Sequence, residues 1–100
     1  MRVRRGGIYI PKQVYDLYFA GLEAVILLRR DADLLILPVR HSAAGGYLLK
    51  VRNAAGDRLV FARDFLRENG CAEDIDREFI PNWENNRAGL SLDNVFSMQI

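Results

Sequence analysis

The sequence has one cysteine and one histidine among its 100 residues. A single thiol, Cys71, cannot form an internal disulfide, which agrees with a reducing compartment. One cysteine and one histidine also cannot supply the nitrogen and sulfur ligands of a structural zinc site. We expect Cys71 to be a small, partly buried residue after a helix end, and His41 to be solvated in a polar linker. The sequence therefore predicts no metal and no cofactor.

Long hydrophobic runs are also missing. The longest are AVILL at 24–28 and LLILPV at 34–39, which are far shorter than a membrane span requires. The basic start MRVRRGG is not followed by an apolar stretch of signal-peptide length. We therefore expect a cytoplasmic protein that does not contact a membrane.

No set of residues converges on a catalytic centre. The carboxylates that could form an acid–base pair are Asp64, Glu68, Asp74 and Asp76. They lie in an expected helix and an expected edge strand, where such groups are mostly solvated, and no nucleophile or oxyanion site accompanies them. The sequence predicts that the protein is not an enzyme.

The composition fits one small globular domain over residues 1–100. Half of the residues are hydrophobic and 27% are charged, a balance typical of folded soluble chains. A core built from so few residues is only marginally stable by itself. For this reason we expect a homodimer.

Charge is unevenly distributed along the chain. Residues 1–30 carry a net charge of +4, residues 31–60 a net charge of +1 and residues 61–100 a net charge of −4. A basic front can bind phosphates. It can equally meet the acidic back of the same chain or of a partner, and the sequence does not choose between the two.

The first 39 residues predict a compact unit. A basic arm closed by Gly6-Gly7 leads to a short strand at 8–10, and Pro11 then suits the first turn of a helix over 13–21. The apolar runs at 24–28 and 34–39, separated by the polar turn 29–33, predict a hairpin.

The remainder predicts a second, looser unit. Residues 40–46 are expected to be a linker, residues 47–52 and 58–61 a second hairpin, and residues 62–69 a helix ended by Gly70. Residues 73–80 are expected to form a final edge strand. Residues 81–100 have no clear period and are expected to form an extended tail that wraps its own barrel or covers a neighbour. We expect Trp83 to anchor this tail against another surface.

The two units contain segments that can be aligned as a repeat. Ile8 to Val14 (IYIPKQV) can be aligned with Leu59 to Phe65 (LVFARDF), and Lys12 then aligns with Arg63. Both segments are strand followed by helix. The alignment predicts two pseudo-equivalent halves, 1–40 and 46–80, in one chain.

At residues 8–39 the chain resembles the AbrB-type swapped-hairpin domain of transition-state regulators, antitoxins and MraZ proteins. The resemblance is carried by Ile8-Tyr9-Ile10-Pro11-Lys12-Gln13-Val14, then an apolar helix, Val25-Ile26-Leu27-Leu28, a polar turn and Leu34-Leu35-Ile36-Leu37-Pro38. It implies an α+β fold, a small β-barrel of two strand–helix–hairpin halves, formed by a dimer or by one chain.

The same resemblance implies a DNA-binding transcriptional regulator or antitoxin-like protein. By position, its DNA contacts would be Arg4, Arg5, Lys12, Arg29 and Arg30, because these side chains neutralise phosphates and arginine also reaches guanine edges. The alternative is a non-catalytic protein-interaction or assembly module. That module would bind its protein partner through the tail residue Trp83 and through Tyr15 and Tyr18 of the aromatic helix.

Overall fold

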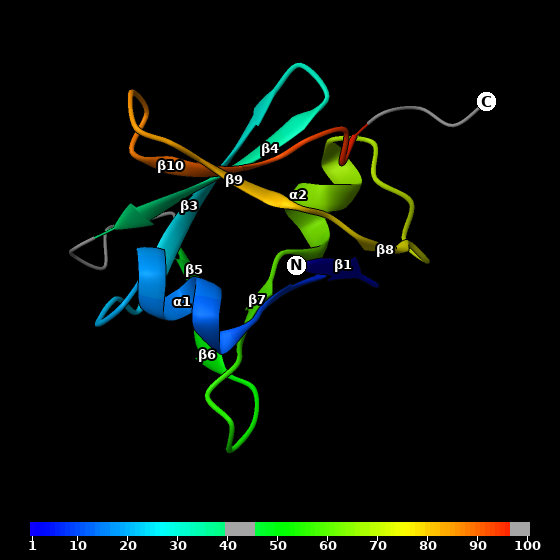
Figure 1. Ribbon diagram of the computed structural model, residues 1–100. Coiled ribbons are helices and arrows are strands. Elements are labelled where there is room, and N and C mark those ends of the chain that lie inside the picture. Colours follow the sequence, from blue (N-terminus) through cyan, green and yellow to red (C-terminus); the bar gives the residue numbers. More distant parts are fainter. Residues whose placement is uncertain (40–45, 97–100) are drawn as a thin grey trace.

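The computed structural model describes residues 1–39 and 46–96, and these form two antiparallel sheets and two short helices (Figure 1). Sheet A has the strand order β6 (Lys50–Val51), β7 (Arg58–Phe61), β2 (Gly7–Ile10), β1 (Arg2–Arg4) and β8 (Asp76–Glu78). Sheet B has the order β5 (Tyr47–Leu48), β3 (Ala24–Arg30), β4 (Asp33–Val39), β10 (Gly89–Leu92) and β9 (Pro81–Glu84). The helices are α1 (Lys12–Tyr18) and α2 (Arg63–Glu68).

The strand, proline, helix and hairpin predicted for the first unit are confirmed. Pro11 precedes α1 in an extended conformation, with φ −60° and ψ 151°, which suits the fixed φ of proline. The helix ends earlier than predicted, because Phe19 leaves helical geometry. The hairpin turn is shorter than predicted, since β3 and β4 continue pairing as far as Arg30 and Asp33.

The predicted basic arm is instead a strand. Residues Arg2–Arg4 pair with β2 on one side and with β8 on the other. Val3 is fully buried, and burying this apolar side chain favours the pairing. The arginines of β1 therefore have fixed positions on a sheet and cannot act as a flexible arm.

The core lies between the two sheets. Alternate residues of sheet A point inward, among them Val3, Ile8, Ile10 and Val60. From sheet B, Leu34, Ile36 and Leu90 are fully buried in the same cluster. Phe19, just after α1, closes one part of it. This period of two along the strands is what burial of one sheet face requires.

The second predicted hairpin is confirmed in part. Strands β6 and β7 pair as expected around the turn at residues 53–57. Tyr47 and Leu48, however, pair with β3 in sheet B, so the chain crosses between the sheets at the buried Leu49. The predicted linker at 40–46 lies outside the described residues except for Gly46.

The prediction of an extended tail from residue 81 is wrong for residues 81–92. Strands β9 and β10 form a hairpin, and β10 lies between β4 and β9 in sheet B. All four residues of β10 are buried. The expected boundary at residue 80 therefore does not separate a core from a tail. Residues 97–100 lie outside the described part of the chain.

The predicted barrel is not closed, because strands of sheet A pair only within sheet A and those of sheet B only within sheet B over the described residues. The strand orders are nevertheless symmetric. Exchanging β1, β2, β3 and β4 with β6, β7, β9 and β10 reverses the runs β6-β7-β2-β1 and β3-β4-β10-β9 and leaves the neighbours within each run the same. The strands of the proposed repeat, β2 and β7, pair with each other.

Candidate nucleic-acid interface

Much of the basic front is bonded to the acidic back of the same chain. Arg2 forms ion pairs with both Asp76 and Glu78 of β8, and Arg4 lies 3.7 Å from Asp76. These pairs join β1 to its neighbour in sheet A. Part of the positive charge of residues 1–30 is therefore neutralised by acidic residues of the same chain and is not left for phosphates.

Arg30 and Arg29, both predicted to bind DNA, also have internal partners. Arg30 donates from Nη1 and Nη2 to the two carboxylate oxygens of Glu84 at 2.8 and 2.6 Å. Arg29 donates to the backbone carbonyls of Asp31 and Asn69 at 2.6 and 2.8 Å. Both side chains lie at the far end of the β3–β4 hairpin and stabilise it.

The residues predicted to bind a protein partner pack inside the chain. The rings of Trp83 and Tyr18 are stacked, with centroids 4.8 Å apart and planes within 4°. Tyr15 is buried, and its hydroxyl lies 3.2 Å from the carbonyl oxygen of Leu22. Trp83 therefore contacts α1 of its own chain, and its contact with a protein partner stays a prediction.

A different surface gathers cations and aromatic rings, and we call it the open face of sheet A. Residues directly opposite in antiparallel strands share a face. The register therefore aligns Asp76, Arg4, Gly7 and Phe61 in one row across the sheet. The next row is Glu78, Arg2, Tyr9, Leu59 and Lys50. Arg52, whose guanidinium lies 4.8 Å from the Tyr9 ring centroid, completes the open face.

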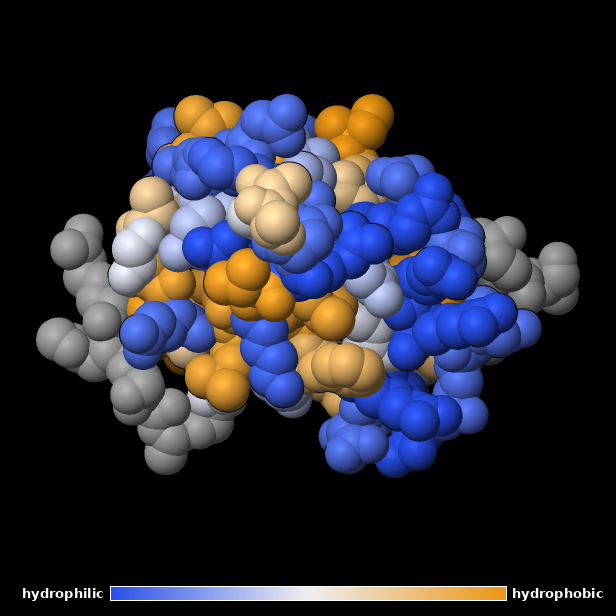
Figure 2. All heavy atoms as spheres, turned by 90° about the horizontal axis from the view of Figure 1, so that it is seen from below, coloured by the Kyte–Doolittle hydropathy of each residue, from blue (hydrophilic) through white to orange (hydrophobic). Residues whose placement is uncertain are grey.

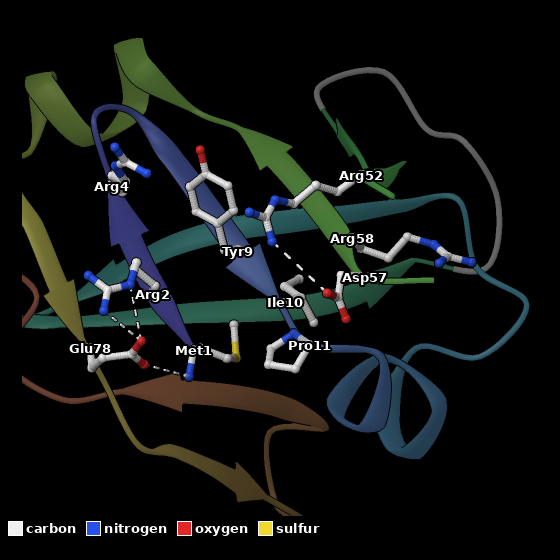
Figure 3. Close-up of a pocket in the computed structure, with 10 residues that line it drawn as sticks. All are labelled: Met1, Arg2, Arg4, Tyr9, Ile10, Pro11, Arg52, Asp57, Arg58 and Glu78. Carbon is white, nitrogen blue, oxygen red and sulfur yellow. Dashed lines mark hydrogen bonds and ion pairs between the residues drawn. The ribbon is translucent and has the colours of Figure 1, made fainter. Parts of the chain in front are cut away.

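One end of the open face is a pocket of about 270 Å³ (Figure 3). Tyr9 lies between Arg52 on one side and Arg2 and Arg4 on the other. Hydrogen bonds from the Asn53 side chain and the Lys12 backbone N–H lower the pKa of Asp57, so that this carboxylate keeps its charge to lower pH than an ordinary aspartate. The lining combines cations and carboxylates with apolar atoms: Met1, Arg2, Arg4, Tyr9, Ile10, Pro11, Arg52, Asp57, Arg58 and Glu78.

Some cations on or next to the open face have no partner in the part of the chain that the structure describes. Within the described residues, no hydrogen bond or ion pair involves the side chains of Arg5, Lys50 and Arg63. Arg5 follows β1, Lys50 lies in β6 and the stem of Arg63 packs on Gly6 next to Arg5. These charges are available to an external anion.

Exposed apolar groups lie on the same side of the molecule as the β6 edge. In a view from below Figure 1, hydrophobic side chains gather toward α1 and β6, while the side of β8 is hydrophilic (Figure 2). The exposed hydrophobic side chains there include Leu17, Leu48 and Val51. Phe61, on the open face, is 60% exposed.

The structure brings only part of the predicted DNA-binding set together. Arg4 and Arg5 lie at the same end of sheet A. Lys12 begins α1 and pairs with Asp16. Sequence reasoning missed Tyr9, Lys50, Arg52, Phe61 and Arg63. The alternation of Leu59-Val60-Phe61 indicates two faces, but only the strand pairing shows that Phe61 shares its face with the arginines.

Other kinds of site find no support in residues 1–39 and 46–96. No group of three or more metal-ligating side chains occurs there, and no helix in these ranges is long and apolar enough to cross a membrane. Burial raises the pKa of the Cys71 thiol, which disfavours the reactive thiolate.

Comparison with known proteins adds no functional information: no family model, no curated protein and no solved structure matches the chain.

Proposed function

We propose that this protein binds nucleic acid through the open face of sheet A, as a small non-catalytic DNA-binding regulator of the kind that its AbrB-type resemblance implies. The observation that carries the proposal is the set of cations that have no side-chain partner among residues 1–39 and 46–96, namely Arg5, Lys50 and Arg63, around a face that already bears Arg4 and Arg52. When a protein cation binds a phosphate, counterions condensed on the nucleic acid are released, and this release favours binding. A cation that has no ion pair within the protein is free to make such a contact.

The position of these cations fits a long polyanion better than a small anion. Lys50 lies in the edge strand β6, whereas Arg5 follows β1 near the other edge of sheet A. Three strand spacings of about 4.8 Å separate β6 from β1. A nucleic acid lying across the sheet would meet both ends, which a single phosphate group would not.

The test compares two triple variants with the same change in net charge. One replaces Arg5, Lys50 and Arg63 by glutamine, and the other replaces Arg67, Arg77 and Arg87 by glutamine. Binding to a labelled mixed-sequence duplex is measured by fluorescence anisotropy over a series of salt concentrations. We expect the first variant to bind more weakly and to lose about one unit of salt slope for each phosphate contact removed. We expect the second to bind like the wild type.

Two outcomes contradict the proposal. If the wild-type protein binds neither duplex nor single-stranded DNA at roughly 50 mM salt, where phosphate contacts are strong, the protein does not bind nucleic acid in this way. If both triple variants lose affinity equally, the attraction is a property of total charge and the open face is not the contact.

A further inference from the structure

We propose that the open face binds single-stranded nucleic acid in preference to duplex, with unpaired bases stacking on Phe61 and on the Arg52–Tyr9 pair. This inference rests on the proposed function and specifies its ligand. It starts from Phe61, the last residue of β7, whose aromatic ring is 60% exposed.

The neighbours of Phe61 leave its ring accessible. The residue opposite on β2 is Gly7, which has no side chain to cover the ring. A Cβ atom at Gly7 would lie 2.9 Å from Leu59 Cδ1 and 3.2 Å from Tyr9 Cε1, so the side chains of Leu59 and Tyr9 occupy the space beside this glycine. No ring stacking or cation–π contact involves Phe61 within the described residues. A large apolar surface in contact with water is unfavourable, and a base that covers it removes that cost.

Tyr9 and Arg52 provide the second stacking position. The Arg52 guanidinium lies over the Tyr9 ring, and only the Asp57 carboxylate, 4.0 Å away, is its ion-pair partner in the described chain. A guanidinium held flat on a ring offers its opposite side to a base. Arginine planes and aromatic rings are the groups on which proteins commonly stack unpaired bases.

The spacing of the two positions favours unstacked bases. Tyr9 faces Leu59, so Phe61 is its diagonal neighbour on β7, and diagonal neighbours lie about 7–8 Å apart. Stacked bases in a duplex are about 3.4 Å apart along each strand, and their faces are covered by the adjacent bases. Only a strand whose bases are separated can place one base at each position. Arg4, in the same row as Phe61, then lies within reach of the backbone phosphates.

Affinity for three ligands tests this inference: a 20-nucleotide oligo-dT, a 20-nucleotide oligo-U, and a 20-base-pair mixed duplex. The proteins are the wild type, Phe61→Ala, Phe61→Trp and the control Leu17→Ala. Leu17 is also a highly exposed hydrophobic residue, but it lies on α1. Because Phe61 is mostly exposed, its replacement leaves the core intact, and circular dichroism of each variant checks this.

We expect the wild type to bind at least one single strand more tightly than duplex. Phe61→Ala should weaken single-strand binding roughly 5- to 150-fold, the range for losing one stacked base, with little change for duplex. Phe61→Trp should retain affinity and Leu17→Ala should not change it. A difference between oligo-dT and oligo-U shows whether DNA or RNA is preferred.

The inference fails separately from the proposed function. If duplex binds as tightly as the single strands, or if Phe61→Ala has no effect on single strands, stacking is overturned while the phosphate contacts stand. If none of the three ligands binds at low salt, both proposals are overturned.

Discussion

The ion pair between Arg30 and Glu84 lies diagonally across the outer face of sheet B. Arg30 is in β3 and Glu84 in β9, and the pairs Leu28–Leu35, Leu35–Ser91 and Ser91–Asn82 form the row between them. Leu35 and Ser91 are almost fully buried although they belong to this outer row. The two long side chains therefore shield the middle of the sheet in addition to joining its distant strands.

The hydrogen bonds from Arg30 lower the pKa of Glu84 below its ordinary value of 4.5. A carboxylate whose pKa is lower in the folded state stabilises the protein above its unfolded pKa. This contribution is lost as the pH falls through the folded pKa. We expect Glu84→Gln to lower the free energy of unfolding at pH 7. At about pH 3, the difference in free energy of unfolding between variant and wild type should be smaller. Urea unfolding at both pH values measures this.

The matched control is Glu68→Gln, since the Glu68 side chain has no hydrogen bond or ion pair in the described residues. It should leave the free energy of unfolding nearly unchanged at both pH values. If Glu84→Gln lowers the free energy of unfolding by the same amount at pH 7 and pH 3, the charge of the Glu84 carboxylate is not the cause.

The sequence indicates that a basic front can meet an acidic back, but it does not identify the pairs. Arg30 and Glu84 are 54 positions apart, and their meeting depends on the placement of β10 between β4 and β9. Arginine was predicted to contact DNA because its chemistry suits phosphate, and the same chemistry suits a carboxylate. Residue type alone cannot distinguish the two uses.

Among the elements, the β1–β2 hairpin depends most clearly on backbone geometry. Its turn residues Arg5 and Gly6 have φ values of 47° and 85°, as in a type I′ turn, whose twist matches that of the strands. Gly6 is also crowded, because a Cβ atom there would lie 2.8 Å from Arg63 Cβ and 3.1 Å from Arg63 Cα. The turn therefore packs against the first residue of α2.

We expect Gly6→Ala to destabilise the protein by roughly 2 kcal/mol or more, because it adds a steric clash to the strain of a positive φ. Gly70→Ala isolates the second effect, since Gly70 has φ +90° and no atom within 4 Å of an added Cβ. The free energy of unfolding of Gly70→Ala should fall by only about 1 kcal/mol. Thermal or urea unfolding compares the two. Equal losses would mean that Arg63 moves aside at little cost.

Local elements were predictable where a periodic pattern and a turn signal coincide. Pro11 and the apolar spacing of α1 mark the helix, and the polar turn between two apolar runs marks the β3–β4 hairpin. The β9–β10 hairpin was missed because Pro81–Glu84 is polar and Gly89 opens the next strand. Strand β10 is stabilised by pairing with β4, and β9 by pairing with β10. No local pattern in the sequence records these contacts.

At the scale of the whole molecule, the two central strand pairs join the two symmetric sets of strands within one chain. β2 pairs with β7 in sheet A, and β4 pairs with β10 in sheet B. We therefore expect folding to be complete without a second subunit. The urea midpoint should then be the same at roughly 1 µM and roughly 100 µM protein, because only a stabilising partner makes it depend on concentration.

Native mass in solution, recorded at both concentrations, completes this test. A midpoint that rises with concentration would support the homodimer expected from the small core. A constant midpoint with a monomeric mass would support a fold in which one chain supplies both halves.

The position of β10 has a consequence for how the protein is made. About 50 residues separate the end of β4 from the start of β10, and a ribosome adds roughly 5–20 residues per second. For several seconds, the nascent chain would present the apolar β4 segment with one edge unpaired, which is a surface prone to aggregation. Slow translation of residues 40–88 would prolong the exposure of this β4 edge. From the strand order alone, we expect the nascent chain to depend on chaperones during synthesis.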